Sequence, residues 1–194
     1  MESPRIVLAS TSPYRRALLD RLRLPYTVVA PRVDEAPTPG EAAADTALRL
    51  ARSKARAVAS RNSGTLVIGC DQVAALDGGT LGKPGNRENA VAQLKVMRGK
   101  CVLFHTALAL LNTDTGAMQA ADVPTAVWFR SFSDREIDRY LDLEQPYDCA
   151  GSAKIEGLGI VLVERISGDD PSALIGLPLM RLSAMLRAEG VASV

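Results

Sequence analysis

The run at residues 65–70 places the tightest limit on the fold. Its residues, Thr-Leu-Val-Ile-Gly-Cys, are mostly apolar and do not alternate with polar ones, which predicts a strand buried on both faces. Strands of this kind belong to α/β proteins, whose sheets are covered by helices. The run leads directly into Asp71 and Gln72. An acid at the end of a central strand is costly to bury unless it is paired or binds a metal, so we favour a functional role for Asp71.

A second strand and the helix after it form a predicted anion site. Residues 6–8 are apolar and include β-branched residues, which predicts a short strand, and Ser12-Pro13 is an N-cap followed by proline at the first helical position. Arg15 and Arg16 then fall in the first two turns, where the helix dipole disfavours positive charge. A phosphate held at the helix N-terminus would explain them. Solvated arginines on an ordinary amphipathic helix are an equally weighted alternative.

The remaining pattern alternates between helical and extended segments. Strands are expected at 26–30, 100–112, 117–132 and 160–163, with a hairpin turn at 76–80. Helices are expected at about 41–61, 86–98 and 133–143, and at the C-terminal end up to about Gly190. Asp169 to Ser172 is expected to open a further short helix. No linker or repeat interrupts the chain, which predicts a single domain over residues 1–194.

Charged side chains in this pattern suggest phosphate chemistry. Glu35 and Asp71 each follow a predicted strand, and carboxylate oxygens of this kind suit Mg²⁺ or Mn²⁺. Arg15, Lys54 and Lys83 supply positive charge for phosphates. For single residues the plainer readings stay open. Glu35 belongs to an acidic stretch that fits a solvated loop. Lys54, within an apolar helix face, either extends its ammonium to the edge of the helix or points into an internal polar site, and for the residue alone the first is favoured.

Composition excludes several classes of protein. A net charge of +1 gives no basic field for nucleic acid. No apolar stretch is long enough to span a bilayer, and the N-terminus has no signal-peptide pattern. Three cysteines without metal-ligand spacing fit a reducing cytoplasm. We therefore expect a cytoplasmic protein that acts on a small molecule, with no membrane and no nucleic-acid partner.

Short motifs along nearly the whole chain resemble the Maf family of nucleotide pyrophosphatases. They are Ser10-Thr11-Ser12-Pro13-Tyr14-Arg15-Arg16, Val33-Asp34-Glu35, Lys54, Gly69-Cys70-Asp71-Gln72, Gly82-Lys83-Pro84 and Ala150-Gly151-Ser152. The resemblance implies an elongated mixed β-sheet with flanking helices and two lobes around a central cleft, similar to the inosine triphosphate pyrophosphatases. It also implies hydrolysis of a nucleoside triphosphate between its α and β phosphates, with a divalent metal.

The resemblance also assigns roles to individual residues. Asp71 would be the catalytic proton acceptor that activates water, and Glu35 would help Asp71 to hold the metal. The phosphates would be bound by Ser10, Arg15, Lys54 and Lys83.

Within this resemblance, three positions indicate which nucleotide base the protein accepts. They are Tyr14, Gln72 and Glu156. They resemble the YceF-like subgroup, which acts on 7-methyl-GTP and usually has tryptophan at the position of Tyr14. N7-methylguanine carries a positive charge, so an aromatic ring stacked on it contributes about 0.5–2 kcal/mol to binding through a cation–π interaction. A carboxylate can accept hydrogen bonds from the guanine N1–H and N2–H₂ edge, whereas it would repel pyrimidine acceptors. The plainer reading makes Tyr14 a core residue and Glu156 a surface charge.

Two other functions remain in view. The first is a pyrophosphatase for dTTP and UTP, since those enzymes carry arginine, threonine and glutamine at the three positions. The second is a non-catalytic regulator of septum formation and cell division arrest, a role also associated with the family. The sequence leaves the preferred metal and the formation of a homodimer open.

Overall fold

The computed structural model describes residues 4–36, 38–60 and 63–191. Its strands are β1 (Arg5–Ala9), β2 (Tyr26–Val28), β3 (Thr65–Leu76), β4 (Gly79–Leu81), β5 (Cys101–Asn112), β6 (Met118–Phe129) and β7 (Val163–Gly168). Its helices are α1 (Pro13–Leu19), α2 (Ala43–Ala59), α3 (Arg87–Met97), α4 (Asp134–Glu144) and α5 (Leu179–Ala188). Short 3₁₀ segments occur at η1 (Asp20–Leu22), η2 (Ala150–Ser152) and η3 (Leu158–Leu162).

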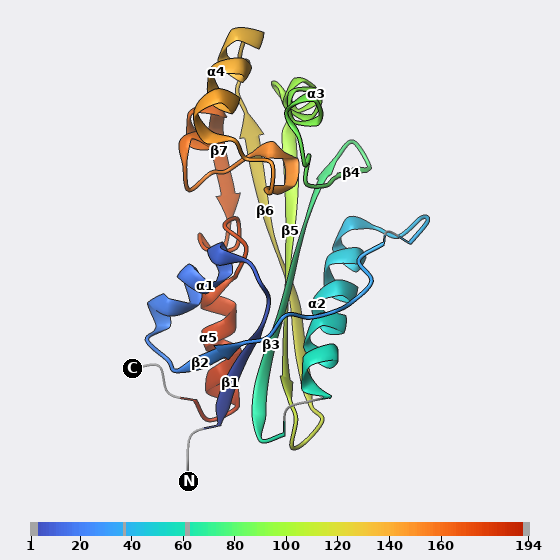
Figure 1. Cartoon of the computed structure of the whole chain (residues 1–194), viewed down its shortest axis with the longest axis vertical. Coiled ribbons are helices and arrows are strands. Elements are labelled where there is room, and N and C mark those ends of the chain that lie inside the picture. Colours follow the sequence, from blue (N-terminus) through green and yellow to red (C-terminus); the bar gives the residue numbers. More distant parts are fainter. Residues whose placement is uncertain (1–3, 37, 61–62, 192–194) are drawn as a thin grey trace. The chain divides into compact units, whose positions relative to one another are not determined.

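Within these residues the strands form one mixed, seven-stranded sheet (Figure 1). The order is β2-β1-β3-β5-β6-β7, and β4 pairs with β3. β1 runs parallel to both β2 and β3, whereas β4 and β7 run antiparallel to β3 and β6. This confirms the predicted α/β class with a mixed sheet and flanking helices.

The chain divides into two compact units. Unit 1 comprises residues up to 71, 106–123 and 170 onwards, and unit 2 comprises residues 72–105 and 124–169. The long strands β3, β5 and β6 each contribute residues to both units. The candidate residues Ser10, Tyr14, Arg15, Glu35, Lys54 and Asp71 belong to unit 1, and Gln72, Lys83 and Glu156 belong to unit 2.

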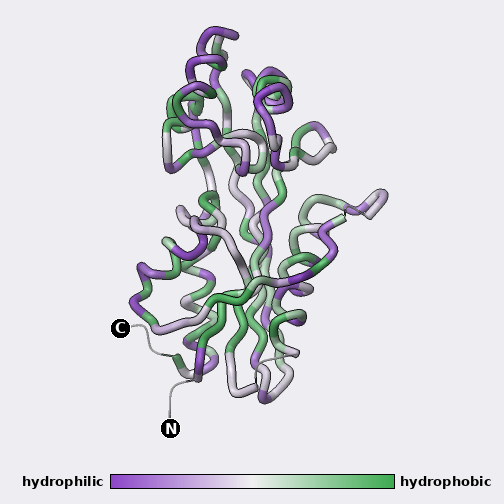
Figure 2. Tube along the Cα trace, viewed as in Figure 1, coloured by the Kyte–Doolittle hydropathy of each residue, from purple (hydrophilic) through white to green (hydrophobic). Residues whose placement is uncertain are grey.

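The sheet of unit 1 is covered by helices on both faces. Figure 1 shows α1 and α5 on one side of β1 and β3, and α2 on the other. Ile6, Leu8 and Ile68 pack into a cluster with residues of α1 and α5. Val7 and Val67 alternate with them, are also buried, and therefore face α2. Hydrophobic residues accordingly follow these strands in Figure 2, which confirms the prediction of a strand buried on both faces.

Helix α2 lies against β3 at Gly69. A Cβ atom added to Gly69 would lie 2.1 Å from the carbonyl oxygen of Ala51 and 2.7 Å from the amide nitrogen of Ala55. Only glycine allows the helix backbone to approach this closely. Lys54 lies on this part of α2, and Asp71 follows Gly69 on the same face of β3. The close approach therefore brings Lys54 to Asp71.

Unit 2 has its own core beneath α3 and α4. Helix α3 contacts α4 and η2, and α4 contacts η3. The largest fully buried side chains of this unit include Phe104, Phe129, Tyr140, Leu94 and Met97. Helix α4 begins at a capping box, in which Ser133 and Glu136 satisfy each other's backbone N–H groups, as their spacing predicts.

The strand predicted at 160–163 is wrong. Residues 158–162 form the 3₁₀ segment η3, and the strand β7 starts only at Val163. The cause lies in the preceding turn, where Gly157 and Gly159 both donate their N–H groups to the carbonyl of Lys154. These bonds curl the chain, and Ile160 is left exposed instead of entering the sheet.

The short helix predicted to open at 169–172 is also wrong, because these residues lie in turns. The buried Asp170 side chain instead caps a helix further along the chain, accepting from the N–H groups of Met180 and Arg181 in α5. Its other oxygen accepts from the hydroxyl of Ser172. Asp170 therefore does cap a helix, but the helix is α5 and not one that starts at Asp170 itself. Arg61, the predicted end of α2, lies outside the described residues.

Candidate active site in two units

A buried lysine joins the two acids that the sequence proposed for a metal. The ammonium of Lys54 lies 2.6 Å from Asp71 Oδ1 and 2.8 Å from Glu35 Oε1. The side chains of Lys54 and Asp71 are only 6% and 10% exposed, whereas that of Glu35 is 58% exposed. The group therefore has a buried end on β3 and an open end on the loop after β2.

Two expectations about this group were wrong. Asp71 lies inside β3 and not just past its end, because the strand continues to Leu76 and turns back through the hairpin to β4. Lys54 does not extend to the edge of its helix. A buried carboxylate needs a positive partner, and a buried ammonium needs a negative one. By pointing inwards to Asp71, Lys54 gives both groups an oppositely charged partner.

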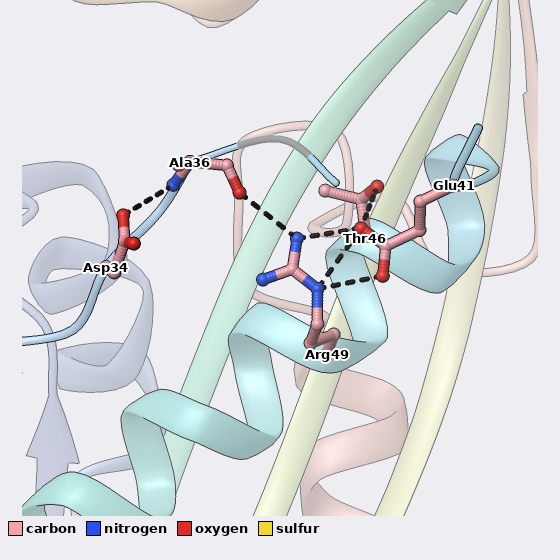
Figure 3. A network of polar contacts seen from close by, with 5 residues as sticks. All are labelled: Asp34, Ala36, Glu41, Thr46 and Arg49. Atoms are coloured by element: carbon pink, nitrogen blue, oxygen red, sulfur yellow. Dashed lines mark hydrogen bonds and ion pairs between the residues drawn. The ribbon is translucent and has the colours of Figure 1, made fainter. Parts of the chain in front are cut away.

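A polar network holds the loop that carries Glu35 (Figure 3). Arg49 of α2 donates to both carboxylate oxygens of Glu41, with a shortest distance of 2.7 Å. Its guanidinium also reaches the carbonyl of Ala36 at 3.4 Å, and the N–H of Ala36 donates to Asp34 Oδ1. The hydrogen bond from Arg49 is the main cause that lowers the pKa of Glu41 to about 2. The ion pair of Arg49 and Glu41 therefore stays charged near neutral pH, and the network contacts the chain on both sides of Glu35.

The helix start with its Ser12 cap is formed as predicted, whereas the binding of an anion there stays a prediction. Ser12 caps the helix by accepting from the N–H of Arg15, and Ser10 accepts from the N–H of Ser12. Arg15 donates through Nε to the carbonyl of Gly176 at 2.9 Å, a contact that ties α1 to the turn before α5. Ser10 is buried, and Tyr14 and Arg15 are half-buried.

The thiol of Cys70 shares the carbonyl of Gly176 with Arg15, at a distance of 3.0 Å. Burial raises the pKa of the Cys70 thiol, so it stays protonated and can keep donating. This agrees with a small buried residue that closes the packing of β3.

In unit 2, Lys83 is exposed on a loop, and the residue before it is held by hydrogen bonds. The carbonyl of Gly82 accepts from Gln93 Nε2 at 3.0 Å and from the N–H of Gly151 at 3.2 Å. Gln93 Oε1 accepts in turn from the buried Ser152 hydroxyl at 2.6 Å. These contacts join two of the sequence motifs, the one around Lys83 and the one at 150–152.

Glu156 lies on the turn between η2 and η3 and is exposed. Partial loss of water is the largest cause that raises the pKa of Glu156 above its ordinary value, and Glu144 and Asp148 add to it. Lys154 and a backbone hydrogen bond act in the opposite direction. Gln72 is half-buried on β3, and it faces the side of the strand opposite to Asp71 because successive side chains alternate.

The carboxylates of Glu35 and Asp71 fit a hard divalent cation. Both carboxylates contact the Lys54 ammonium, so they lie close to one point, and oxygen donors suit Mg²⁺ and Mn²⁺. Among the residues that the structure describes, no three acidic, histidine or cysteine side chains gather into a metal-binding cluster. Magnesium is commonly held by one or two carboxylates together with substrate phosphates, and two carboxylates meet that requirement.

Several contributing residues were missed by the sequence interpretation. Arg49 and Glu41 lie on or before α2 and read as ordinary surface charges, although they fix the loop of Glu35. Glu144 and Tyr140, on α4, hold the turn of Glu156. The i, i+4 spacing of Tyr140 and Glu144 shows that they share a helix face, but nothing in the sequence indicates what they contact.

The described residues contain no helix with the length and apolar character needed to cross a membrane. All three cysteines lie in the described part of the chain, and no two of them form a disulfide.

Comparison with known proteins gives matches over nearly the full length. The family model described as Maf-like protein matches residues 5–189. A protein of Thiobacillus denitrificans named 7-methyl-GTP pyrophosphatase is 60% identical over 189 residues, which cover 97% of this chain and 94% of the relative. Proteins with the same name from Cupriavidus metallidurans and Ralstonia nicotianae are 58% and 59% identical, covering 96% and 95% of this chain and 94% and 95% of their own.

Among solved structures, the HAM1 protein from Coxiella burnetii aligns with 65% of this chain and 73% of its own, with a TM-score of 0.44 and 17% identity. The Ham1 protein of Staphylococcus aureus aligns with 64% of this chain and 71% of its own, with a TM-score of 0.45 and 18% identity.

Proposed function

Because the chain belongs to the family of Maf-like proteins, we propose that it is a nucleotide pyrophosphatase that hydrolyses 7-methyl-GTP to 7-methyl-GMP and diphosphate. The supporting observation is the identity of about 58–60% to relatives named 7-methyl-GTP pyrophosphatase. The enzyme class is a hydrolase of phosphorus-containing anhydrides. Its role in the cell would be to remove modified nucleotides from the pool.

The proposed reaction begins with a water molecule near Asp71. The carboxylate of Asp71 accepts a proton as the water oxygen bonds to the α-phosphorus, and the bond from that phosphorus to the bridging oxygen breaks. Diphosphate leaves. Lys54 holds Asp71 in place at 2.6 Å and, with Arg15 and Lys83, would offset phosphate charge, and the hydroxyl of Ser10 would donate a hydrogen bond to a phosphate oxygen. Glu35 and Asp71 would hold Mg²⁺ or Mn²⁺, which supplies neutralisation of negative charge when bound.

The base is assigned to Tyr14, Gln72 and Glu156. The half-exposed ring of Tyr14 would stack on the cationic base. The carboxylate of Glu156 would accept from the N1–H and N2–H₂ groups of guanine, and its exposed position on the turn supports this role. A pyrimidine would present acceptors to the same carboxylate and be disfavoured.

A substrate panel tests the proposal. Purified protein with Mg²⁺ or Mn²⁺ is given 7-methyl-GTP, GTP, UTP, dTTP, CTP and ITP, and diphosphate release is followed. We expect clear preference for 7-methyl-GTP. The exchange Tyr14→Arg with Glu156→Gln is expected to shift preference towards UTP and dTTP, because the carboxylate acceptor for guanine is then missing. Preference of the unmodified protein for UTP or dTTP would overturn the base assignment.

The raised pKa of Glu156 leads to a prediction about acid. Glu156 accepts hydrogen bonds from guanine only when ionised, and a raised pKa means that it protonates at a higher pH than an ordinary glutamate. As the pH falls, the KM for 7-methyl-GTP should therefore begin to rise at a higher pH than the titration of an ordinary glutamate would give. Initial rates of the wild type and of Glu156→Gln at each pH provide the measurement. A pH-dependent KM that is the same in both would contradict the prediction.

We further propose that the protein works in the cytoplasm. The support comes from its three cysteines, which form no disulfide, as expected in a reducing compartment.

A further inference from the structure

The turn that carries Glu156 is organised around a single backbone carbonyl. The N–H groups of Gly157 and Gly159 donate to the carbonyl of Lys154 at 3.1 and 3.0 Å. A Cβ atom on Gly159 would lie 2.5 Å from that carbonyl oxygen, so glycine is needed there for lack of space. These bonds close the loop on itself, but they do not attach it to the rest of unit 2.

Helix α4 attaches the turn through two side chains spaced four residues apart. The hydroxyl of Tyr140 accepts from the N–H of Lys154 and donates to the carbonyl of Ser152, both at 3.1 Å. Tyr140 is almost fully buried, and burial raises the pKa of its phenol, so the O–H group remains a donor. Tyr140 therefore fixes the start of the turn.

Glu144 holds the turn on both sides of Glu156. Its Oε1 atom accepts from the ammonium of Lys154 at 2.6 Å, and its Oε2 atom accepts from the N–H of Leu158 at 2.6 Å. Lys154 and Leu158 lie two residues before and two residues after Glu156. The approach is tight, since a Cβ atom on Gly157 would lie 2.7 Å from Glu144 Oε2. Both oxygens of Glu144 thus have partners within the protein.

We propose that Glu144 is a positioning residue for base selection, which sets the place of the Glu156 carboxylate by clamping Lys154 and Leu158. The inference rests on the proposed function, because it takes Glu156 as the group that reads the base. Glu144 itself does not touch the nucleotide in this account. The substrate group concerned is the N1–H and N2–H₂ edge of a purine.

The test compares Glu144→Gln with Asp142→Asn, a matched change on the same helix. Asp142 forms an exposed ion pair with Arg87 and has no bond to the turn in the described contacts. We expect Glu144→Gln to raise the KM for 7-methyl-GTP about tenfold with little change in kcat, because a misplaced carboxylate weakens binding of the base. UTP kinetics should change much less. Asp142→Asn should leave both substrates unaffected.

A double variant separates positioning from general damage. If Glu144 acts through Glu156, adding Glu144→Gln to Glu156→Gln should not reduce the selectivity for 7-methyl-GTP further. Additive losses, or equal losses of kcat for all nucleotides, would overturn the proposal. Lys154→Met removes the same clamp from its other end and should give the same change in KM, so it serves if Glu144→Gln does not fold.

Amide hydrogen exchange distinguishes failure of this proposal from failure of the proposed function. In the protein without nucleotide, the N–H of Leu158 should exchange faster in Glu144→Gln than in the wild type or Asp142→Asn, because its acceptor is weakened. Unchanged exchange contradicts the clamp, whatever the substrate. Faster exchange combined with no preference for 7-methyl-GTP in the wild type supports the clamp and rejects the proposed function, and with it the role in base selection.

Discussion

Replacement of Asp71 by asparagine is expected to reduce kcat for 7-methyl-GTP hydrolysis by roughly two or more orders of magnitude. Asparagine has the same size and keeps one oxygen that can accept a hydrogen bond from Lys54, whose ammonium lies 2.6 Å from Asp71 Oδ1 in the wild type. It cannot take a proton from the attacking water. The substitution removes the proposed proton acceptor and the charge of one of the two carboxylates proposed to hold the metal, and it leaves Glu35 as the remaining acidic partner of Lys54. Because the phosphate- and base-binding side chains are unchanged, KM for the nucleotide should move much less than kcat.

The measurement is steady-state diphosphate release by the wild type, Asp71→Asn and Asp77→Asn. Asp77 is the matched control, since it lies in the exposed turn between β3 and β4 and its side chain is 68% exposed. Asp77→Asn should retain wild-type kcat. If Asp71→Asn also kept its kcat, the assignment of Asp71 as the proton acceptor would fail; absence of turnover in the wild type would instead favour a non-catalytic role in cell division.

Replacement of Lys54 by methionine is expected to cost about 3 kcal/mol or more of unfolding free energy. Methionine fills similar space, so the loss comes from the carboxylate of Asp71, which is left buried without its positive partner. Glu35 loses its partner as well, but its exposed side chain can be hydrated instead. The effect on stability should thus arise mainly from the buried end of the group.

Urea unfolding of Lys54→Met and Lys100→Met measures this effect. Lys100 pairs with Asp77 at 2.7 Å, close to the distance of the buried pair, but the two side chains are 45% and 68% exposed. Exposed pairs contribute about 0–1 kcal/mol, so Lys100→Met should change stability little. Equal losses in the two variants would mean that Lys54 does not compensate a buried charge. The double variant with Asp71→Asn should recover part of the loss.

Local sequence signals predicted the elements well where one segment carries all the information. The cap at Ser12, the capping box at Ser133 and the apolar face of α2 each depend on residues within a few positions of one another, and each is found as predicted. The doubly buried run at 65–70 likewise follows from its own composition.

Two of the errors involve a partner that is distant in sequence. Lys54 was expected at the edge of its helix because its attraction to Asp71 depends on how α2 packs on β3. Asp170 was expected to cap the residues next to it, but it caps α5. The clamp formed by Glu144 is invisible in the sequence for the same reason. The two acids and the lysine were predicted to belong to one site, but not that Lys54 forms ion pairs with both acids; their roles stay predictions.

The close approach at Gly69 has a consequence for how this chain can be varied. If the codon for Gly69 is randomised, only glycine should be found among folded variants. Any side chain there collides with main-chain atoms of α2, which cannot move aside as a side chain can. Gly78, in contrast, has no atom within 4 Å of an added Cβ and needs glycine only for its positive φ, which asparagine tolerates. Engineered or evolved variants of this protein can therefore change the hairpin, whereas the distance between β3 and α2 cannot change.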